Sequence, residues 1–181
     1  MKDITQELLK HLTLERLEEN LYRGESRDIG SPNVYGGQVL GQALFAASQT
    51  VEGRDAHSLH AYFLRPGDKK EPVVYEVDRI RDGRRYTTRR IVAIQRGKPI
   101  FNMSASFKIS EEGIEHQCEM PEVPGPEDLP NMTELGKQAL ADIPEKLSRF
   151  LKWKRPIELR PVQPIHLLHP EPAPPFRDIW I

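Results

Sequence analysis

Two histidines, His57 and His60, stand three residues apart in a stretch of alternating polarity. A histidine titrates near neutral pH, so His57 is a candidate general base for a reaction that needs an activated water. Metal binding is a competing chemistry, but residues three apart on a strand point to opposite faces of a sheet. This spacing disfavours one ion held by both rings. A hydrogen-bonded histidine with only a structural role is the remaining interpretation.

Backbone groups offer a second kind of chemistry at Gly36 and Gly37, which begin a stretch of small and apolar residues. If this stretch is a helix, both N–H groups lie at its positive end and can stabilise negative charge on a substrate carbonyl. The competing interpretation is that the glycines only permit close packing. Gln38 and Gln42 lie four residues apart on one face of this helix. They either line a ligand pocket or make structural hydrogen bonds.

Cationic side chains cluster around the Asp82-Gly83 dipeptide. Two interpretations are open: the guanidinium groups bind phosphates, or they surround a solvated hairpin tip that discourages edge pairing between sheets. Arg65 and Lys69, beside a Pro-Gly turn, are alternative phosphate contacts. The cluster consists of Arg79, Arg81, Arg84, Arg85, Arg89 and Arg90.

The single cysteine, Cys118, cannot form an internal disulfide, and neither its neighbours nor its spacing mark it as a nucleophile. A reducing, cytoplasmic compartment is therefore expected. The chain has 26 Lys and Arg against 27 Asp and Glu, a formal net charge of -1 that disfavours a nucleic-acid partner. No apolar run approaches the roughly 18 residues that a membrane-spanning helix needs.

The elements that must position these residues follow from periodicity. Residues 4–12 predict a short amphipathic helix, after which helix and strand are equally compatible with the pattern beyond residue 17. Residues 29–33 predict a loop, and residues 36–47 predict a buried helix. From His57 the period becomes two, and turn residues separate four runs that predict an antiparallel meander. These runs are residues 57–65, 72–80, 85–95 and 100–109. The fold class is therefore α+β.

Residues 121–181 differ in composition because prolines recur in them, and proline is excluded from the interior of helices and central strands. Residues 133–152 predict one helix, interrupted near Pro144. Residues 176–181 look like the opening of a strand with no partner after it, an ending that suggests truncation. We therefore divide the chain into an N-terminal domain, 1–120, and residues 121–181, a Pro-rich linker with a helix and the start of a second domain that is missing.

Three segments together resemble the type II acyl-CoA thioesterases. They are VYGGQVLGQAL at 34–44, HSLHAYFLRPGD at 57–68 and GKPIF at 97–101. Their order and separations make the match specific, and the likeness runs from about residue 5 to the last residue. The resemblance implies a double hotdog, in which each of two successive copies wraps a long central helix in an antiparallel sheet. This chain corresponds to the first copy and the linker.

The resemblance also implies an activity and a site. The family hydrolyses fatty acyl-CoA to free fatty acid and CoA, needs no cofactor or metal, and takes its catalytic Asp, Ser or Thr, and Gln from the second copy. The chain alone is therefore expected to be inactive, with His57 as its own candidate catalytic residue. An acyl tunnel is expected beside the central helix, lined by residues such as Leu40, Leu44 and Phe101. The expected substrate-binding residues are Tyr35, Gly36, Gly37, Gln38, Phe63 and Arg65.

Other functions remain open at this point. A noncatalytic acyl-CoA binding module needs only the pocket. A hotdog hydratase or dehydratase needs a histidine paired with an acid, and His57 has no evident acidic partner in sequence. A purely structural interaction protein would bind no acyl-CoA. The expected partners are acyl-CoA and either a second hotdog domain or another copy in a homo-oligomer, because a lone copy leaves an edge strand uncovered.

Overall fold

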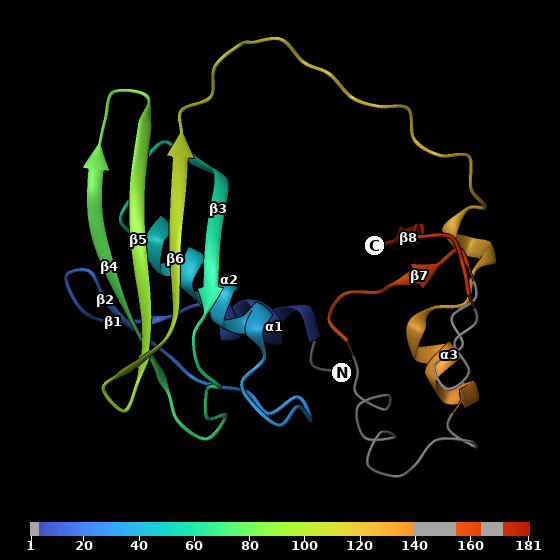
Figure 1. The fold of residues 1–181 in the computed structure, drawn as a ribbon, viewed down its shortest axis with the longest axis horizontal. Coiled ribbons are helices and arrows are strands. Elements are labelled where there is room, and N and C mark those ends of the chain that lie inside the picture. Colours follow the sequence, from blue (N-terminus) through green and yellow to red (C-terminus); the bar gives the residue numbers. More distant parts are fainter. Residues whose placement is uncertain (1–3, 140–154, 164–171) are drawn as a thin grey trace. The chain divides into compact units, whose positions relative to one another are not determined.

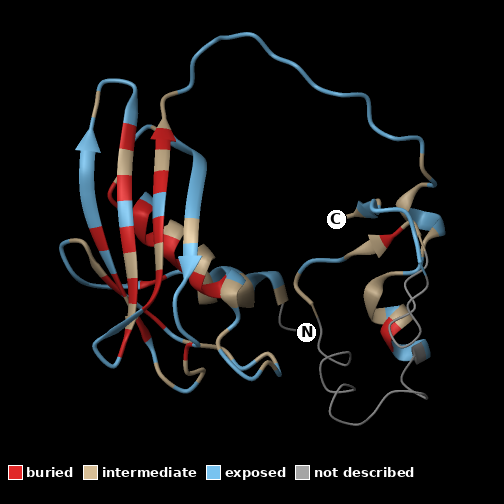
Figure 2. Cartoon of the chain, in the orientation of Figure 1, coloured by how far each residue is buried: buried red, intermediate tan, exposed pale blue. Residues whose placement is uncertain are grey.

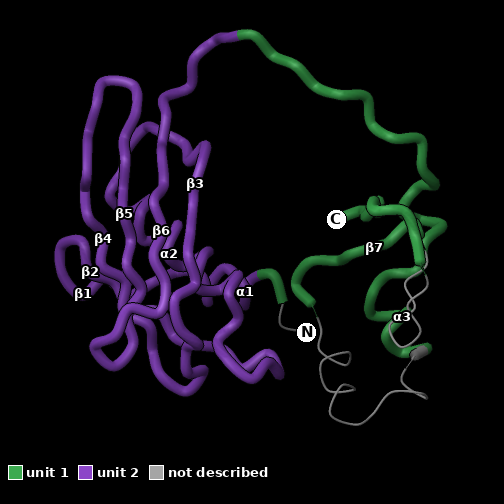
Figure 3. The backbone as a smooth tube through the Cα atoms, viewed as in Figure 1, with its two compact units in different colours: residues 1–5, 114–181 green, residues 6–113 purple. Residues whose placement is uncertain are grey.

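The computed structural model describes residues 4–139, 155–163 and 172–181. The chain divides into two compact units, shown in Figure 3. We name residues 6–113 the sheet unit, and residues 1–5 with 114–181 the tail unit. In the described part of the chain, no helix has the length and apolar character needed to cross a membrane.

The chain begins with helix α1, Ile4–Leu12, which confirms the amphipathic helix expected there. The ambiguity beyond residue 17 resolves as two short strands, β1 at Glu15–Glu18 and β2 at Leu21–Gly24. Asn20 lies between them with a φ of 62°, a left-handed conformation that asparagine tolerates better than most residues. A helix cannot pass through such a residue, and the chain reverses direction there.

The second helix, α2 at Gly36–Ser48, confirms the expected buried helix. Four strands follow: β3 at Asp55–Phe63, β4 at Val73–Asp82, β5 at Tyr86–Gln95 and β6 at Lys98–Lys108. They join β1 and β2 in a six-stranded sheet of order β1-β2-β4-β5-β6-β3. Figure 1 shows α2 lying against one face of this sheet. The expected arrangement of a long helix wrapped by an antiparallel sheet is confirmed.

The predicted meander is right for β4, β5 and β6 but wrong for β3, which pairs with β6 rather than with β4. The connections explain the difference. Arg96 and Gly97 join β5 to β6 with φ values of 49° and 71°, as a two-residue type I′ hairpin turn requires. The connection around Pro66-Gly67 is longer, so it does not force the flanking strands to pair. It carries the chain from one edge of the sheet to its interior.

The core lies between α2 and the sheet face that it covers. Burial alternates along β6 as its sequence predicted, with one polar and one buried face (Figure 2). Fully burying a phenylalanine contributes about 1.5–3 kcal/mol, so Phe101 and Phe107 are major contributors to this core. Its buried apolar members on β6 and α2 are Ile100, Phe101, Met103, Ala105 and Phe107, with Val39, Ala43, Ala46 and Ala47.

The tail unit contains a 3-10 turn η1 at Pro126–Asp128, helix α3 at Met132–Ala139, and a strand pair. Helix α3 confirms the start of the helix predicted at 133–152, and the remainder of that prediction lies outside the described residues. Strand β7, Arg160–Pro161, pairs antiparallel with β8, Ile179–Trp180. The last segment is therefore a strand as expected, but it has a partner, which precedes it in the chain.

Candidate functional site

An apolar pocket of about 360 Å³ lies at the N-terminal end of α2. Four segments build it: the loop before α2, the first turn of α2, the end of β3 with the loop that follows, and the start of β6. We name it the α2 pocket. It is lined by Asn33, Val34, Gly36, Val39, Phe63, Leu64, Arg65, Pro66, Gly67, Ile100 and Phe101. Among these lining residues there is no His, Asp or Glu.

Backbone hydrogen bonds hold the walls of the α2 pocket together. Both Leu64 and Arg65 donate their N–H groups to the carbonyl of Ile100, at 2.8 and 3.2 Å. The N–H of Val34 donates to the carbonyl of Gly67 at 2.9 Å, which ties the loop before α2 to the loop after β3. The pocket is therefore preformed by main-chain contacts between segments far apart in sequence.

Two phenylalanines form one side of the pocket. Phe101 is fully buried, whereas Phe63 is 59% exposed, and their ring centroids lie 5.1 Å apart. Gly36 faces the Phe63 ring closely: a Cβ atom on Gly36 would lie 3.0 Å from two of its ring carbons. Of the predicted substrate-binding residues, the structure brings Gly36, Phe63 and Arg65 together around the α2 pocket.

The start of α2 presents backbone donors. Tyr35 is the N-cap residue, and its carbonyl accepts hydrogen bonds from the N–H groups of Gln38 and Val39. The first N–H groups of a helix, here those of Gly36 and Gly37, have no acceptor within the helix itself. Tyr35 is 55% exposed, and its ring lies over Gly37, where a Cβ would come within 2.5 Å of it. Close packing therefore accounts for both glycines, while their N–H groups remain at the positive end of α2.

Gln38 and Gln42 are buried and make structural hydrogen bonds. The amide of Gln38 donates to the carbonyl of Glu25 and accepts from the N–H of Arg27. The fully buried Gln42 donates to the carbonyls of His11 and Glu25 and accepts from the hydroxyl of Tyr75 at 2.7 Å. Burial raises the pKa of Tyr75 above its ordinary range, so this hydroxyl stays protonated and donates. Gln38 is therefore bonded away from the residues that line the α2 pocket.

His57 lies on the other face of the sheet. Its Nε2 is 2.8 Å from Oγ of Ser106, on the polar face of β6, and its ring meets Tyr86 edge-on. The expectation that His57 and His60 point to opposite faces is wrong. The register shifts between Ala56 and Ser58, and His60 pairs with Ser104, so this β-bulge places both histidines on the face away from α2. The structure does not bring His57 to the α2 pocket.

Arg65 lies at the rim of the pocket, where its Nη1 donates to the carbonyl of Pro99 at 2.6 Å. Lys69, the other alternative phosphate contact, is engaged within the chain. Its Nζ forms an ion pair with Asp28 at 2.9 Å and donates to the carbonyl of Ser31 at 2.9 Å. Lys69 therefore fastens the loop before α2 instead.

The predicted arginine cluster divides into two kinds of residue. Arg79, Arg85 and Arg90 are exposed and form ion pairs with Glu19, Glu111 and Asp78 respectively. These fit the solvated hairpin interpretation.

Arg89 fits neither interpretation, because it is buried. Its guanidinium donates to the hydroxyl and carbonyl of Thr50 and to the carbonyl of Arg81, and it pairs with Asp82 at 2.6 Å. The hydrogen bond from Arg89 holds the pKa of the Asp82 carboxyl below its usual range. This residue joins the loop after α2 to the turn end of the β4–β5 hairpin.

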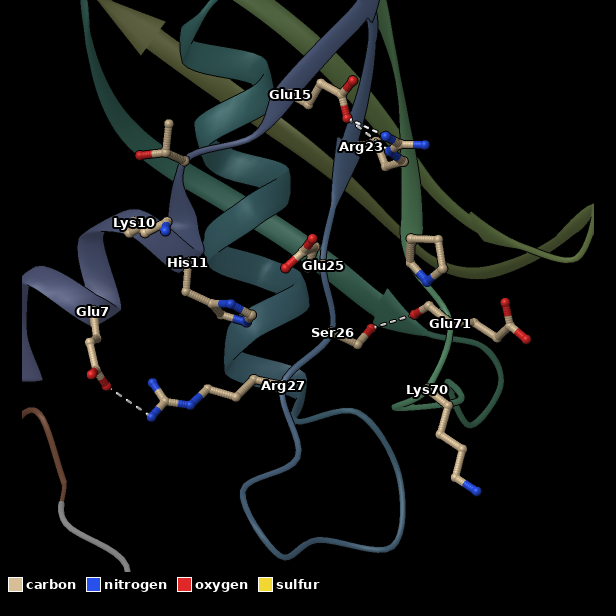
Figure 4. A pocket seen from close by; sticks show the side chains of 12 residues that line it. Glu7, Lys10, His11, Glu15, Arg23, Glu25, Ser26, Arg27, Lys70 and Glu71 are labelled. Atoms are coloured by element: carbon tan, nitrogen blue, oxygen red, sulfur yellow. Dashed lines mark hydrogen bonds and ion pairs between the residues drawn. The ribbon is translucent and has the colours of Figure 1, made fainter.

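A second, larger hollow of about 770 Å³ lies beside α1, and Figure 4 shows its lining side chains. Its charges are of both signs and several are paired, including Glu7 with Arg27 and Glu15 with Arg23. Within the described ranges, no group of three or more His, Cys, Asp or Glu side chains is placed to hold a metal ion. Cys118, in the tail unit, is an exposed free thiol.

Sequence reasoning missed several residues of the α2 pocket: Val34, Val39, Leu64 and Ile100. All four lie inside the three segments that carry the family resemblance, but none of them was named as a substrate-binding or tunnel-lining residue. The signal that could have found them is the Pro66-Gly67 turn, which follows β3 and is hydrogen-bonded to the loop before the helix.

The sequence of this chain resembles those of known proteins. Residues 23–108 match the family model described as "Acyl-CoA thioesterase N-terminal domain". The chain is 42% identical over 161 residues to acyl-CoA thioesterase 2 of Haemophilus influenzae, an alignment that covers 88% of this chain and 56% of that protein. The chain thus spans little more than half the length of this relative.

Two solved structures also resemble this chain. An acyl-CoA thioesterase II from Mycobacterium marinum superposes with a TM-score of 0.63 and 46% identity, over 71% of this chain and 47% of that one. A protein from Alicyclobacillus acidocaldarius, described as having a hot dog fold, superposes with a TM-score of 0.67 at 21% identity, over 87% and 55%. The second likeness bears on the fold alone, and it confirms the hotdog expectation.

Proposed function

Because this chain belongs to the acyl-CoA thioesterase family through its N-terminal domain at residues 23–108, we propose that it takes part in hydrolysis of fatty acyl-CoA to fatty acid and CoA. The observation that carries the proposal is the α2 pocket, an apolar cavity that ends beside the N-terminus of a helix. An acyl chain needs an apolar cavity. The thioester carbonyl needs donors aimed at its oxygen, and the two features adjoin here.

In this proposal the acyl chain enters the α2 pocket beside Phe63 and Phe101, and the thioester lies at Gly36 and Gly37. Attack by water moves an electron pair onto the carbonyl oxygen, where the N–H groups at the positive end of α2 stabilise it. Collapse of the tetrahedral intermediate expels the CoA thiolate, a leaving group that needs little acid assistance. Tyr35 borders the carbonyl site, Gln38 fixes the loop before α2, and Arg65 at the rim faces the CoA portion.

The group that activates the water is proposed to come from a second copy of the hotdog fold. Among the described residues that line the α2 pocket there is no general base, and the family resemblance assigns the catalytic Asp, Ser or Thr, and Gln to that second copy. Residues 121–181 are proposed to be the linker toward it, in a cytoplasmic setting that suits the free thiol of Cys118. His57, on edge strand β3, would act only where a second copy brings substrate to its face.

The test is thiol release from decanoyl-CoA by the 181-residue chain, alone and mixed with the part of the Haemophilus influenzae relative that this chain does not cover. We expect little turnover from either polypeptide alone and clear turnover from the mixture. Turnover by the chain alone, lost in His57→Ala but kept in His60→Ala, would move catalysis to His57. No thiol release from any combination would contradict the proposed function.

A second candidate is a noncatalytic acyl-CoA binding module. The same absence of an ionisable base among the pocket-lining residues favours it, since binding needs only the cavity and its donors. Tight binding of decanoyl-CoA by a mixture that releases no thiol would favour this candidate over the enzyme. The hydratase alternative is less compatible with the site, because neither a histidine nor a carboxylate lines the α2 pocket in the described residues.

A further inference from the structure

Two cationic side chains stand beside the exposed rim of the α2 pocket. Arg65 lines the pocket from the loop after β3, and Lys98 begins β6, two residues before Ile100 of the pocket wall. Both residues are exposed to solvent. Neither side chain forms an ion pair with any residue in the described ranges. Both cations are therefore available to a ligand.

The register of β5 and β6 places Lys98 on the same side of the sheet as the α2 pocket. Lys98 pairs with Gln95, and residues directly opposite each other in antiparallel strands share a face. The Gln95 side chain is buried and accepts a hydrogen bond from the N–H of Asp68, in the loop after β3, at 2.8 Å. Its Oε1 would also lie 3.3 Å from a Cβ on Gly67, which lines the pocket. The Lys98 side chain therefore starts from the face on which the pocket lies.

Hydrogen bonds fix Arg65 without occupying most of its guanidinium. Its backbone N–H donates to the carbonyl of Ile100 at 3.2 Å, and its Nη1 donates to the carbonyl of Pro99 at 2.6 Å. A guanidinium carries five N–H donors, so most of them remain available to a ligand. Pro99 follows Lys98 directly in the chain. Arg65 is therefore anchored next to Lys98, and the two cations flank the same part of β6.

The acidic residues of the loop after β3 face a different cation. Asp68 and Glu71 both pair with Arg96, at 3.0 and 2.9 Å. With Arg65 and Lys98, these side chains carry three positive charges against two negative ones, so this part of the surface stays positive. Among the described residues that line the pocket there is no Asp or Glu to oppose it. An anion attached to an apolar chain in the pocket is favoured here.

We propose that Arg65 and Lys98 together bind the phosphate groups of CoA while the acyl chain occupies the α2 pocket. The inference rests on the proposed function, which assigns this pocket to the acyl group. Arginine binds phosphate through several N–H groups and lysine binds it as a point charge. The flexible pantetheine arm separates the phosphates from the thioester, so both ends can be held at once. Two exposed contacts of this kind contribute about threefold each, or about tenfold together, in affinity.

The experiment measures calorimetric affinities of the 181-residue chain for S-decyl-CoA and S-decylpantetheine. Neither thioether is hydrolysed, and only the first carries phosphates. We expect the wild type to prefer S-decyl-CoA by about tenfold at low salt and by less at high salt. Arg65→Gln and Lys98→Gln should each reduce the preference about threefold, and Arg65→Lys should retain part of it. Each variant should bind S-decylpantetheine as the wild type does, which checks that the pocket is intact.

Lys10→Gln is the matched control, because it removes the same charge from an exposed lysine of α1, outside the α2 pocket. Its preference should equal that of the wild type. The inference is overturned if the wild type binds both compounds equally or neither, if the Arg65 and Lys98 variants keep the full preference, or if Lys10→Gln loses as much. Thiol release is assayed separately with the mixture: the expected preferences without hydrolysis would contradict the proposed function alone, and hydrolysis without a preference would contradict this inference alone.

Discussion

At the scale of single residues, the buried Arg89 depends on the polar groups that surround it in the sheet unit. It is a cation with about 1% exposure, and its hydrogen bonds to Thr50 and to the carbonyl of Arg81 replace the water that burial removes. Such a charge is tolerated in a core only when it is paired and fully hydrogen-bonded. Asp82 supplies the negative partner from a partly solvated position.

The Asp82 carboxyl gives a testable dependence of stability on pH. Its pKa is lowered in the folded state, chiefly by the hydrogen bond from Arg89, so the ionised carboxylate favours folding. This contribution is fully present above the unfolded pKa of about 3.9 and is lost as pH falls through the lower folded value. Because the Asp82 side chain is 57% exposed, screening limits it to about 1 kcal/mol.

We expect Asp82→Asn to lower the free energy of unfolding at pH 7, and the difference from wild type to shrink below about pH 4. Urea denaturation at a series of pH values measures both. The matched control is Asp78→Asn, since Asp78 pairs with the exposed Arg90 and should matter less at pH 7. An Asp82→Asn deficit that persists unchanged at pH 2 would show that the carboxylate charge is not its source.

At the scale of elements, the loop between β2 and α2 depends on Lys69 from the loop after β3. Lys69 is half-buried, and its Nζ reaches both Asp28 and the carbonyl of Ser31. The same two loops are joined by the hydrogen bond from Val34 to Gly67, at the wall of the α2 pocket. A substitution at Lys69 should therefore alter the wall of the pocket, although Lys69 does not line it.

Replacement of Lys69 by methionine keeps most of the side-chain bulk and removes the ammonium. We expect amide exchange at Val34 to accelerate about fivefold, since a hydrogen bond of this kind contributes about 1 kcal/mol to local stability. Hydrogen–deuterium exchange resolved to this loop measures the effect. Lys70→Met changes the neighbouring exposed lysine and should leave the rate near that of wild type; equal acceleration in both variants would exclude a specific role for Lys69.

The elements also show which parts of the fold follow from sequence. The helices at 4–12 and 36–48 and the strands near their predicted positions follow from local periodicity and turn residues. The place of β3 beside β6 does not follow from sequence, because a long connection such as that around Pro66 does not determine which strand lies next to β3. Bulges are equally hard to predict from sequence, because the register shift at His57 reverses the face of the sheet that simple alternation assigns to this residue. Gly36, Phe63 and Arg65 could be placed together only through a family resemblance, and the burial of Arg89 only through the structure.

At the scale of the whole molecule, the sheet ends on a long open edge. Strand β3 is the last in the order and is largely exposed along its length, including Leu59 and Tyr62. Unpaired backbone groups on such an edge pair readily with another strand. The other edge, β1, has only four residues and offers much less. We therefore expect the chain to associate through β3.

This association is testable with a charge on the edge. Wild-type chain should sediment as a dimer or larger species at micromolar concentration, and Leu59→Lys should shift it toward the monomer, because edge lysines oppose strand addition. The matched control is Tyr86→Lys, since Tyr86 is similarly exposed but lies on β5, which is paired with β4 on one side and β6 on the other. A wild-type chain that is monomeric at all concentrations, or dissociation by both variants alike, would contradict pairing through β3.

The position of β3 also has a consequence for how the chain acquires its structure during synthesis. Phe63 pairs with Phe101, and the intervening residues form the β4–β5 hairpin, which can close before β6 has been made. At roughly 5–20 residues per second, β3 leaves the ribosome about 2–8 seconds before its partner does. Pairings between distant segments form late in any case. For that interval the apolar side chains of β3 are available to chaperones, and slower translation between residues 64 and 98 would lengthen their exposure.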